Sequence, residues 1–436
     1  MATNLPAFPV VDADSHVYEP QAIWDNYIAP EARTAARAAL WHGFDNAGNR
    51  TTILNGRPAK ELNRSKILRQ AIWRPGTKPE DIGQLDPNVF HQPNPGAWDP
   101  EARLKDMDVM GVQRALLFPT IFAEYFPLVE NPDIAAVLAR AYNDWIYDFA
   151  QVEPTRLVPV GILPMQSPLF ARREIDYLAG RGFKAVVLRP MFFAATVTED
   201  RSPAARLEQL ARLMNAGARA APARREAEYR VNNTRGVFLD HRHFRPLLAQ
   251  LEQAGLVACI HPSVGITNPE QTSEGSFVER VAGRMRIGHS VAEATAYLHD
   301  NGLFVTAACF HGLMEQFPRL RLALIHGGAS FIPLVLEKAE TYLWLSFSSF
   351  VNPVSLEPDK VFAEHPTLVS FDGWESSVAR MPDIFQSKAA WGSRYPHHDA
   401  SEASSTLQML DQHGVSAATA SRLMAQNAAQ FFGLEA

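Results

Sequence analysis

The chain has 436 residues, of which 47% are hydrophobic and 20% are charged, and its formal net charge is -6. This composition is typical of a globular protein and excludes an intrinsically disordered one. The net charge provides no basic field for nucleic acid or for an anionic membrane surface, so we expect neither as a partner. With only two cysteines, Cys259 and Cys309, the chain has neither a disulfide framework nor a cysteine-based zinc site.

Residues 1–16 lack the charged segment and apolar core of a secretory signal. No run of about 18 apolar residues, the length that crosses a bilayer, occurs in the sequence. We therefore expect a cytoplasmic protein.

Short apolar, β-branched runs alternate with helix-like segments along the chain. The eight runs are Val10–His16, Arg114–Thr120, Leu157–Met165, Ala185–Pro190, Leu256–Pro262, Arg321–Gly328, Leu368–Trp374 and Lys388–Pro396. Continuous apolar strands bounded by turn residues are typical of a parallel sheet that is buried on both faces. Helices are predicted between them, for example at 133–152, 167–182 and 244–254. This alternation predicts an α/β fold, a distorted (β/α)8 TIM barrel with long loop insertions, and a doubly wound sheet is the alternative.

The predicted strands are unevenly spaced, and three insertions account for the surplus length. They cover about 28–99, 191–236 and 263–301. A barrel of this kind needs about 250 residues, so we expect residues 1–436 to form one barrel domain enlarged by these insertions. Long segments within a compact domain usually act as lids, binding loops or oligomer arms.

Candidate metal ligands lie on the first predicted strand. Asp12, Asp14 and His16 alternate along it, so their side chains share one face, which in a barrel is the lumen. A carboxylate and an imidazole at this spacing can chelate a divalent metal, although such a pair also occurs as a structural hydrogen bond. His261 and His326 end the fifth and sixth predicted strands. We therefore expect these histidines to meet Asp14 and His16 at one mouth of the barrel.

Seven motifs follow one another along the chain: VVDADSHVYEP at 10–20, ARLKDMDVMGVQRALLFPT at 102–120, GFKAVVLRP at 182–190, LVACIHPS at 256–263, RLALIHGGASFIP at 321–333, WGSRYPHHD at 391–399 and NAAQFFGL at 427–434. In this combination and order they resemble the amidohydrolase superfamily, in the branch that includes aminocarboxymuconate-semialdehyde decarboxylase. The resemblance implies a distorted barrel, one divalent metal ion and a homodimer or higher homo-oligomer. Zinc is the expected metal, with manganese or magnesium as alternatives.

The resemblance also implies roles for individual residues. Asp14 and His16 match the metal pair of the first strand, and His261 matches the metal histidine of the fifth strand. His326 matches the sixth-strand histidine that handles protons or polarises metal-bound water, so it is a predicted catalytic residue. Arg189 ends the fourth strand, where related members reach the substrate. The other predicted substrate-binding residues are Phe192, Trp374 and His397.

The eighth-strand motif departs from the family pattern. The usual motif is G-S-D-Y-P-H, whose aspartate binds the metal, whereas residues 392–397 read G-S-R-Y-P-H and place Arg394 at that position. Arginine cannot ligate a cation and stays protonated at any working pH. A guanidinium close to a divalent metal weakens metal binding through like-charge repulsion.

Three outcomes are open for Arg394. It swings away and binds a substrate carboxylate or phenolate while the other ligands keep the metal. Alternatively, it pairs with Asp14 or Asp12 and replaces the metal. In the third outcome, Asp399 or Asp372 turns in as a substitute ligand.

Two reactions suit this scaffold. Hydrolysis needs a base that takes the proton of a metal-bound water, and His326 would serve alone. Decarboxylation instead needs cationic groups that grip a carboxylate, which a guanidinium does well. We therefore expect a metal-dependent lyase that decarboxylates a small aromatic or unsaturated carboxylic acid, with His326 and Arg394 as catalytic residues. The alternatives are a metal-dependent hydrolase of a C–C, ester or amide bond and a metal-free, altered homologue.

Overall fold

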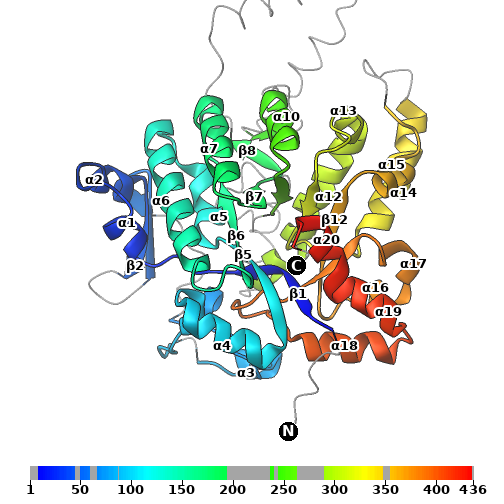
Figure 1. Cartoon of the computed structure of the whole chain (residues 1–436), viewed down its shortest axis with the longest axis horizontal. Coiled ribbons are helices and arrows are strands. Elements are labelled where there is room, and N and C mark those ends of the chain that lie inside the picture. The colour runs from blue at the N-terminus through cyan, green and yellow to red at the C-terminus, as the bar shows by residue number, and fades with distance from the viewer. Residues whose placement is uncertain are drawn as a thin grey trace, which may run out of the picture.

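The computed structural model describes residues 8–44, 50–58, 66–86, 88–193, 236–239, 244–262, 289–346 and 354–434. Eight parallel strands form the central sheet in the order β1-β5-β6-β7-β10-β11-β12-β13 (Figure 1). Their bounds are β1 Val10–His16, β5 Val112–Phe118, β6 Leu157–Ile162, β7 Ala185–Leu188, β10 Val257–Ile260, β11 Leu322–Leu324, β12 Thr367–Asp372 and β13 Ala389–Gly392. Each lies within or overlaps one of the eight predicted runs, and this order confirms the predicted barrel.

Main-chain hydrogen bonds join the first strand to the segment that follows the last one. The N–H of Arg394 donates to the carbonyl oxygen of Asp14 at 2.8 Å, and the N–H of His16 donates to that of Tyr395 at 2.6 Å. The N–H of Ser393 also donates to the Asp12 carboxylate at 2.9 Å. The carboxyl ends of β1 and β13 are therefore held side by side.

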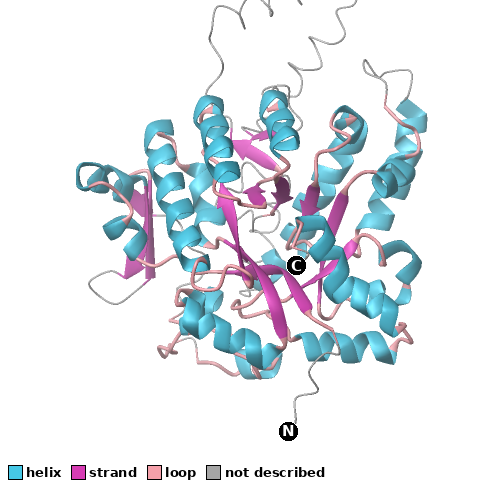
Figure 2. Cartoon of the chain, viewed as in Figure 1, coloured by secondary structure: helices cyan, strands magenta, loops and turns pink. Residues whose placement is uncertain are grey.

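Helices cover the outside of the barrel (Figure 2). The helices predicted at 133–152, 167–182 and 244–254 are present as α6 Pro132–Ala150, α7 Pro168–Gly180 and α10 Arg245–Ala254. Each has proline in its first turn, where the missing N–H has no helical partner to lose. The other α-helices of the described ranges are α1 Ala22–Asn26, α2 Pro30–Ala39, α3 Pro79–Gly83, α4 Pro100–Met110, α5 Ile121–Tyr125, α12 His289–His311, α13 Leu313–Gln316, α14 Ile332–Ser346, α15 Pro358–Glu364, α16 Ser376–Arg380, α17 Pro382–Phe385, α18 Ala403–Gln412, α19 Ala417–Ser421 and α20 Asn427–Phe432.

The first insertion has an outer and an inner part. In the outer part, α2 packs against α6 beside a three-stranded antiparallel sheet of β2 Leu40–Phe44, β3 Arg50–Leu54 and β4 Arg57–Pro58. Figure 1 shows this part, in dark blue, on the flank of the barrel. In the inner part, the N–H of His398 donates to the carbonyl oxygen of Arg69 at 2.8 Å. This contact brings a segment of the insertion to the loop that follows β13.

The other two insertions are described only in part. The strands β8 Met191–Phe193 and β9 Gly236–Phe238 pair in antiparallel fashion, so the second insertion leaves and rejoins the barrel at adjacent points. Residues 194–235 and 263–288 lie outside the described residues. Residues 289–301 of the third insertion are helical and form the first half of α12, which packs against α14.

Both cysteines are buried and unpaired. None of the helices in the described ranges has the length and apolar character needed to cross a membrane.

Candidate metal centre and pocket

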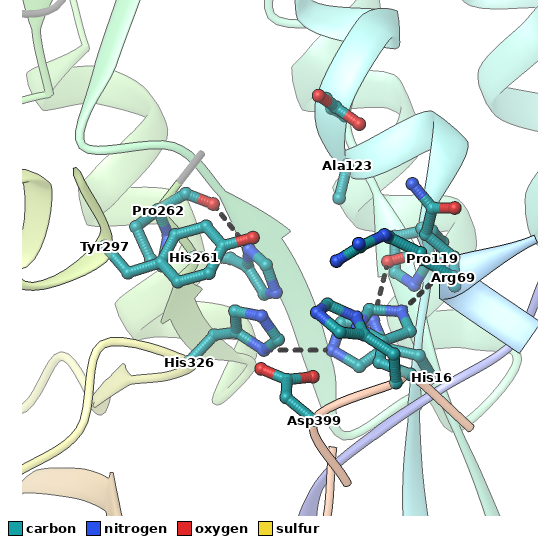
Figure 3. Close-up of a pocket in the computed structure, with 14 residues that line it drawn as sticks. His16, Arg69, Pro119, Ala123, His261, Pro262, Tyr297, His326 and Asp399 are labelled. Atoms are coloured by element: carbon teal, nitrogen blue, oxygen red, sulfur yellow. Dashed lines mark hydrogen bonds between the residues drawn. The ribbon is translucent and has the colours of Figure 1, made fainter. Parts of the chain in front are cut away.

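Asp14, His16, His261 and His326 meet at the carboxyl ends of β1, β10 and β11. One donor atom from each lies within 4.8 Å of those of the others, and all four side chains are buried. Figure 3 shows the three imidazoles turned toward one another. The structure thus brings together the four residues that the strand ends predict.

Carbonyl groups fix the orientation of two of the imidazoles. The Nδ1 of His16 lies 3.0 Å from the carbonyl oxygen of Pro119, and the Nδ1 of His261 lies 2.7 Å from that of Pro262. Because a carbonyl only accepts, each Nδ1 carries the hydrogen, and Nε2 is the nitrogen of each ring that would bind a cation. The Nε2 of His16 lies 3.1 Å from Asp14 Oδ1 and 3.2 Å from His326 Nδ1, so it faces the other members of the cluster. In the described part of the chain, the buried His261 Nε2 and Asp14 Oδ2 have no hydrogen-bond partner. Asp14 Oδ2 does lie 3.3 Å from His326 Nδ1, so His261 Nε2 is the orphaned atom of the pair. Such atoms are rare in protein interiors, and a bound cation would satisfy it.

The protonation states also suit a cation. Burial lowers the pKa of His261 well below its usual range, and burial together with the charge of Arg394 lowers the pKa of His326. Burial acts to raise the pKa of Asp14, but attraction to the neighbouring His326 and His16 outweighs it and holds that pKa well below its usual range. Asp14 is therefore held as a carboxylate and the imidazoles of His261 and His326 are held neutral near pH 7, which are the forms that bind metals.

The cluster opens onto a pocket of about 50 Å³. One water molecule needs about 10–15 Å³ measured in this way, so the pocket holds more than a single water. Besides the three imidazoles, its walls are formed by Arg69, Gln70, Pro119, Thr120, Ala123, Glu124, Pro262, Tyr297, His397, His398 and Asp399 (Figure 3).

Arg69 and Tyr297 are two of the wall residues that the sequence analysis does not identify. Arg69 lies in a short 3-10 turn of the first insertion, and within the described residues its buried Nε has no hydrogen-bond partner. Tyr297 lies on α12, and its ring centroid is 4.8 Å from that of His326. Neither residue sits in a motif, so only the folded chain reveals that both face the cluster.

The predicted substrate-binding residues have different surroundings. His397 lines the pocket and stacks on His16, with the ring centroids 4.2 Å apart. Arg189 is buried, and its Nη1 donates to the carbonyl oxygen of Glu124 at 3.2 Å. Trp374 is 51% exposed, and its ring centroid lies 5.9 Å from the Arg394 guanidinium carbon. The side chain of Phe192 lies outside the described residues.

The buried guanidinium of Arg394 faces two aspartates. Its Nε and Nη2 lie 2.6 and 2.9 Å from the carboxylate oxygens of Asp372, and its Nη1 donates to Asp399 at 2.6 Å. Nη2 also donates to the carbonyl oxygen of His326 at 2.9 Å. Burial acts to lower the pKa of Arg394, but the two carboxylates outweigh it and hold that pKa well above its usual value.

These contacts separate the three outcomes considered for Arg394. The side chain pairs with Asp372 and Asp399 and not with Asp12 or Asp14. Both partner carboxylates face the guanidinium, so neither acts as a substitute ligand in this structure. The Arg394 side chain points away from Asp14, as in the first outcome. Its positive charge, however, is already paired with two carboxylates of the protein and not with a substrate.

The backbone is strained at two residues of the site. His326 and Arg394 have φ angles of 65° and 58°, in the left-handed region that glycine favours. The N–H of His326 donates to Ser370 Oγ at 2.9 Å, and the N–H of Arg394 donates to Asp14. Strained backbone that its surroundings hold in place is common at functional sites.

Comparison with known proteins places the chain in a family. The family model described as Amidohydrolase matches residues 88–434. The 2-amino-3-carboxymuconate-6-semialdehyde decarboxylase of Caenorhabditis elegans is 24% identical over 264 residues, which are 56% of this chain and 59% of that protein. The match therefore spans less than two thirds of this relative.

Solved structures share the barrel. An amidohydrolase from Mycobacterium avium subsp. paratuberculosis K-10 has a TM-score of 0.70 at 16% identity, with 99% of this chain and 100% of that chain covered. The 5-carboxyvanillate decarboxylase of Novosphingobium aromaticivorans DSM 12444, complexed with manganese and 4-hydroxy-3-methoxy-5-nitrobenzoic acid, has a TM-score of 0.60 at 16% identity, with 98% and 96% covered. The family match covers most of the chain and confirms the resemblance seen in its motifs. The chain belongs to the amidohydrolase family.

Proposed function

We propose that the chain is a metal-dependent lyase that removes the carboxyl group, without oxidation, from a small aromatic or unsaturated carboxylic acid. The observation that carries this proposal is the cluster of Asp14, His16, His261 and His326, whose donor atoms converge beside a pocket that contains an arginine. The activities named for the two decarboxylases described above support the same reaction class.

Asp14, His16 and His261 would hold one divalent cation. Imidazole nitrogens suit zinc, whereas manganese and magnesium prefer oxygen ligands, so we propose zinc for a site with two imidazoles and one carboxylate. The similar 5-carboxyvanillate decarboxylase is complexed with manganese, which remains the alternative. When bound, the cation supplies a Lewis acid that draws electron density from the substrate oxygens.

Arg69 is the cation that we assign to the substrate carboxylate. Arg69 lines the pocket, and its buried Nε has no hydrogen-bond partner among the described residues, whereas Arg394 is matched by Asp372 and Asp399. A guanidinium binds a carboxylate through two parallel hydrogen bonds, which fixes the orientation of the acid. The flat rings of His397 and Tyr297 line the same pocket and suit a planar substrate. Contacts of Arg189, Phe192 and Trp374 with the substrate stay predictions.

His326 is the residue that moves the proton. Its Nδ1 lies 3.2 Å from His16 Nε2 and 3.5 Å from Asp14 Oδ1, so Nδ1 is engaged and Nε2 is left to take up and return a proton. The proton adds to the carbon that bears the carboxylate. The bond from this carbon to the carboxylate carbon then breaks, its electron pair stays with the organic product, and carbon dioxide leaves. The net change replaces a carboxylate by hydrogen and needs no oxidant or reductant.

Hydrolysis is less well supported by the site. It needs a base near a metal-bound water, and His326 would have to serve alone because Arg394 engages both Asp372 and Asp399. The metal-free alternative is less well supported, because the predicted ligands converge and the buried Nε2 of His261 has no hydrogen-bond partner among the described residues.

The test combines product and proton readouts. Protein stripped with a chelator is reloaded with zinc or manganese and incubated with 5-carboxyvanillate and with 2-hydroxybenzoates, while release of carbon dioxide and deuterium uptake from heavy water at the vacated ring carbon are measured. We expect both signals from the loaded protein and neither from stripped protein or from the loaded His326→Asn variant. Absence of both signals from loaded wild-type protein across the panel contradicts the proposed reaction. A homodimer or higher oligomer and a cytoplasmic location stay predictions.

A further inference from the structure

A buried arginine outside the pocket contacts the strand that carries His16. Arg103 lies on α4 and is only 1% exposed. Its Nη2 donates to the carbonyl oxygen of His16, and its Nη1 donates to Ser15 Oγ at 3.1 Å. The guanidinium thus holds Ser15 and His16, the last two residues of β1, and His16 is one of the proposed metal ligands.

The same guanidinium reaches two further segments that form the site. Its Nε donates to the carbonyl oxygen of Gly96 at 3.0 Å, in the inner part of the insertion that carries Arg69. Its central carbon lies 4.1 Å from the centroid of the Tyr395 ring, at the start of the loop that carries His397. One side chain therefore joins β1, the insertion and the loop after β13.

This arginine lacks the usual reason for a buried cation. Among the residues that the structure describes, no carboxylate forms an ion pair with Arg103, and its partners are carbonyls, a hydroxyl and an aromatic face. Removing a guanidinium from water without a carboxylate partner is unfavourable. Attraction to the nearby carboxylates of Asp12 and Asp106 offsets part of this cost without direct contact. The direct contacts of the guanidinium instead tie three segments of the site together.

The contacts bear on the direction of the His16 ring. Its Nδ1 is tied to the carbonyl oxygen of Pro119, and its backbone N–H is tied to Tyr395. The carbonyl that Arg103 holds is the remaining polar group of His16 other than Nε2. With Nδ1, N–H and C=O all fixed, Nε2 is aimed at the cluster.

We propose that Arg103 is a positioning residue, which holds His16 in the orientation that binds the metal without touching the metal or the substrate. The inference rests on the metal site of the proposed function. Groups that orient metal ligands from behind typically change metal affinity about 10- to 100-fold when they are removed.

The test measures zinc affinity and the visible absorption spectrum of cobalt-loaded protein, which reports on the geometry of the ligands. We expect Arg103→Met to bind zinc about 10- to 100-fold more weakly and to shift the cobalt bands, and Arg103→Lys to recover part of both. Arg140→Met is the matched control, because Arg140 forms a two-point contact with Glu174 between α6 and α7, away from the cluster. This control is expected to lose stability and to keep the wild-type zinc affinity and spectrum.

If Arg103→Met does not fold, Arg103→Gln takes its place, since it keeps a polar side chain but cannot span three segments. Wild-type zinc affinity and an unchanged cobalt spectrum in the folded variant overturn the positioning role while the metal site stands. If the wild-type protein itself binds neither zinc nor cobalt, the proposed metal site fails, and this inference fails with it.

Discussion

Replacing Arg394 by methionine tests how the site accommodates an arginine in its eighth-strand motif. The substitution keeps an unbranched side chain and removes the charge that lies between Asp372 and Asp399. Breaking a buried ion pair from one side costs roughly 3–5 kcal/mol, because the other charge stays buried. The Asp372 and Asp399 side chains are 12% and 22% exposed, so solvent screens part of this penalty. We therefore expect Arg394→Met to lose roughly 3 kcal/mol of unfolding free energy.

Urea titration measures this loss, and two further variants interpret it. Asp399→Asn added to Arg394→Met should cost less than the sum of the single changes, with a coupling of roughly 0.5–3 kcal/mol. Arg37→Met is the control, since it breaks an ion pair with Asp25 whose side chains are 45% and 49% exposed, and exposed pairs contribute below about 1 kcal/mol. If Arg394→Met loses no more stability than this control, the conclusion that Arg394 forms buried, stabilising ion pairs with Asp372 and Asp399 is wrong.

Two other substitutions probe the surroundings of the site. Glu19 accepts hydrogen bonds from the N–H groups of residues 120–122, and burial raises its pKa from 4.5 to about 7. The stability that protonated Glu19 contributes is therefore complete below about pH 4.5 and is lost as pH rises through 7. Urea titrations should show the unfolding free energy of Glu19→Gln rising by roughly 3 kcal/mol relative to the wild type between these pH values. A difference that does not change with pH contradicts this. A Cβ on Gly392 would lie 2.4 Å from the Cβ of Asp14, so Gly392→Ala should weaken zinc binding measured by calorimetry, whereas Gly302→Ala, whose Cβ has room, should not.

The barrel and the cluster of candidate metal ligands could be predicted because both follow from local patterns. Continuous apolar runs mark strands that are buried on both faces, and His261 and His326 end two of them. Parallel strands of one barrel have their carboxyl ends at one mouth, so the ligands had to converge once the fold was recognised.

The rest of the site depends on contacts between distant segments. Arg69 reaches the pocket because its carbonyl accepts a hydrogen bond from His398, more than 300 residues away, and Tyr297 arrives on α12. The sequence shows that an arginine replaces the family aspartate. Whether Asp372 and Asp399 bind a metal or that arginine is decided by contacts of 2.6–2.9 Å, which no sequence pattern encodes.

The metal content of the reconstituted protein tests the central claim most directly. Protein stripped with a chelator, loaded with excess zinc at pH 7 and freed of unbound metal is measured by mass spectrometry, beside His261→Ala prepared in the same way. The account predicts about one zinc ion per chain in the wild type and a large loss in the variant, because His261 contributes a buried, unpartnered Nε2 to the cluster. Wild-type protein without bound metal, or a variant that retains it fully, contradicts the account.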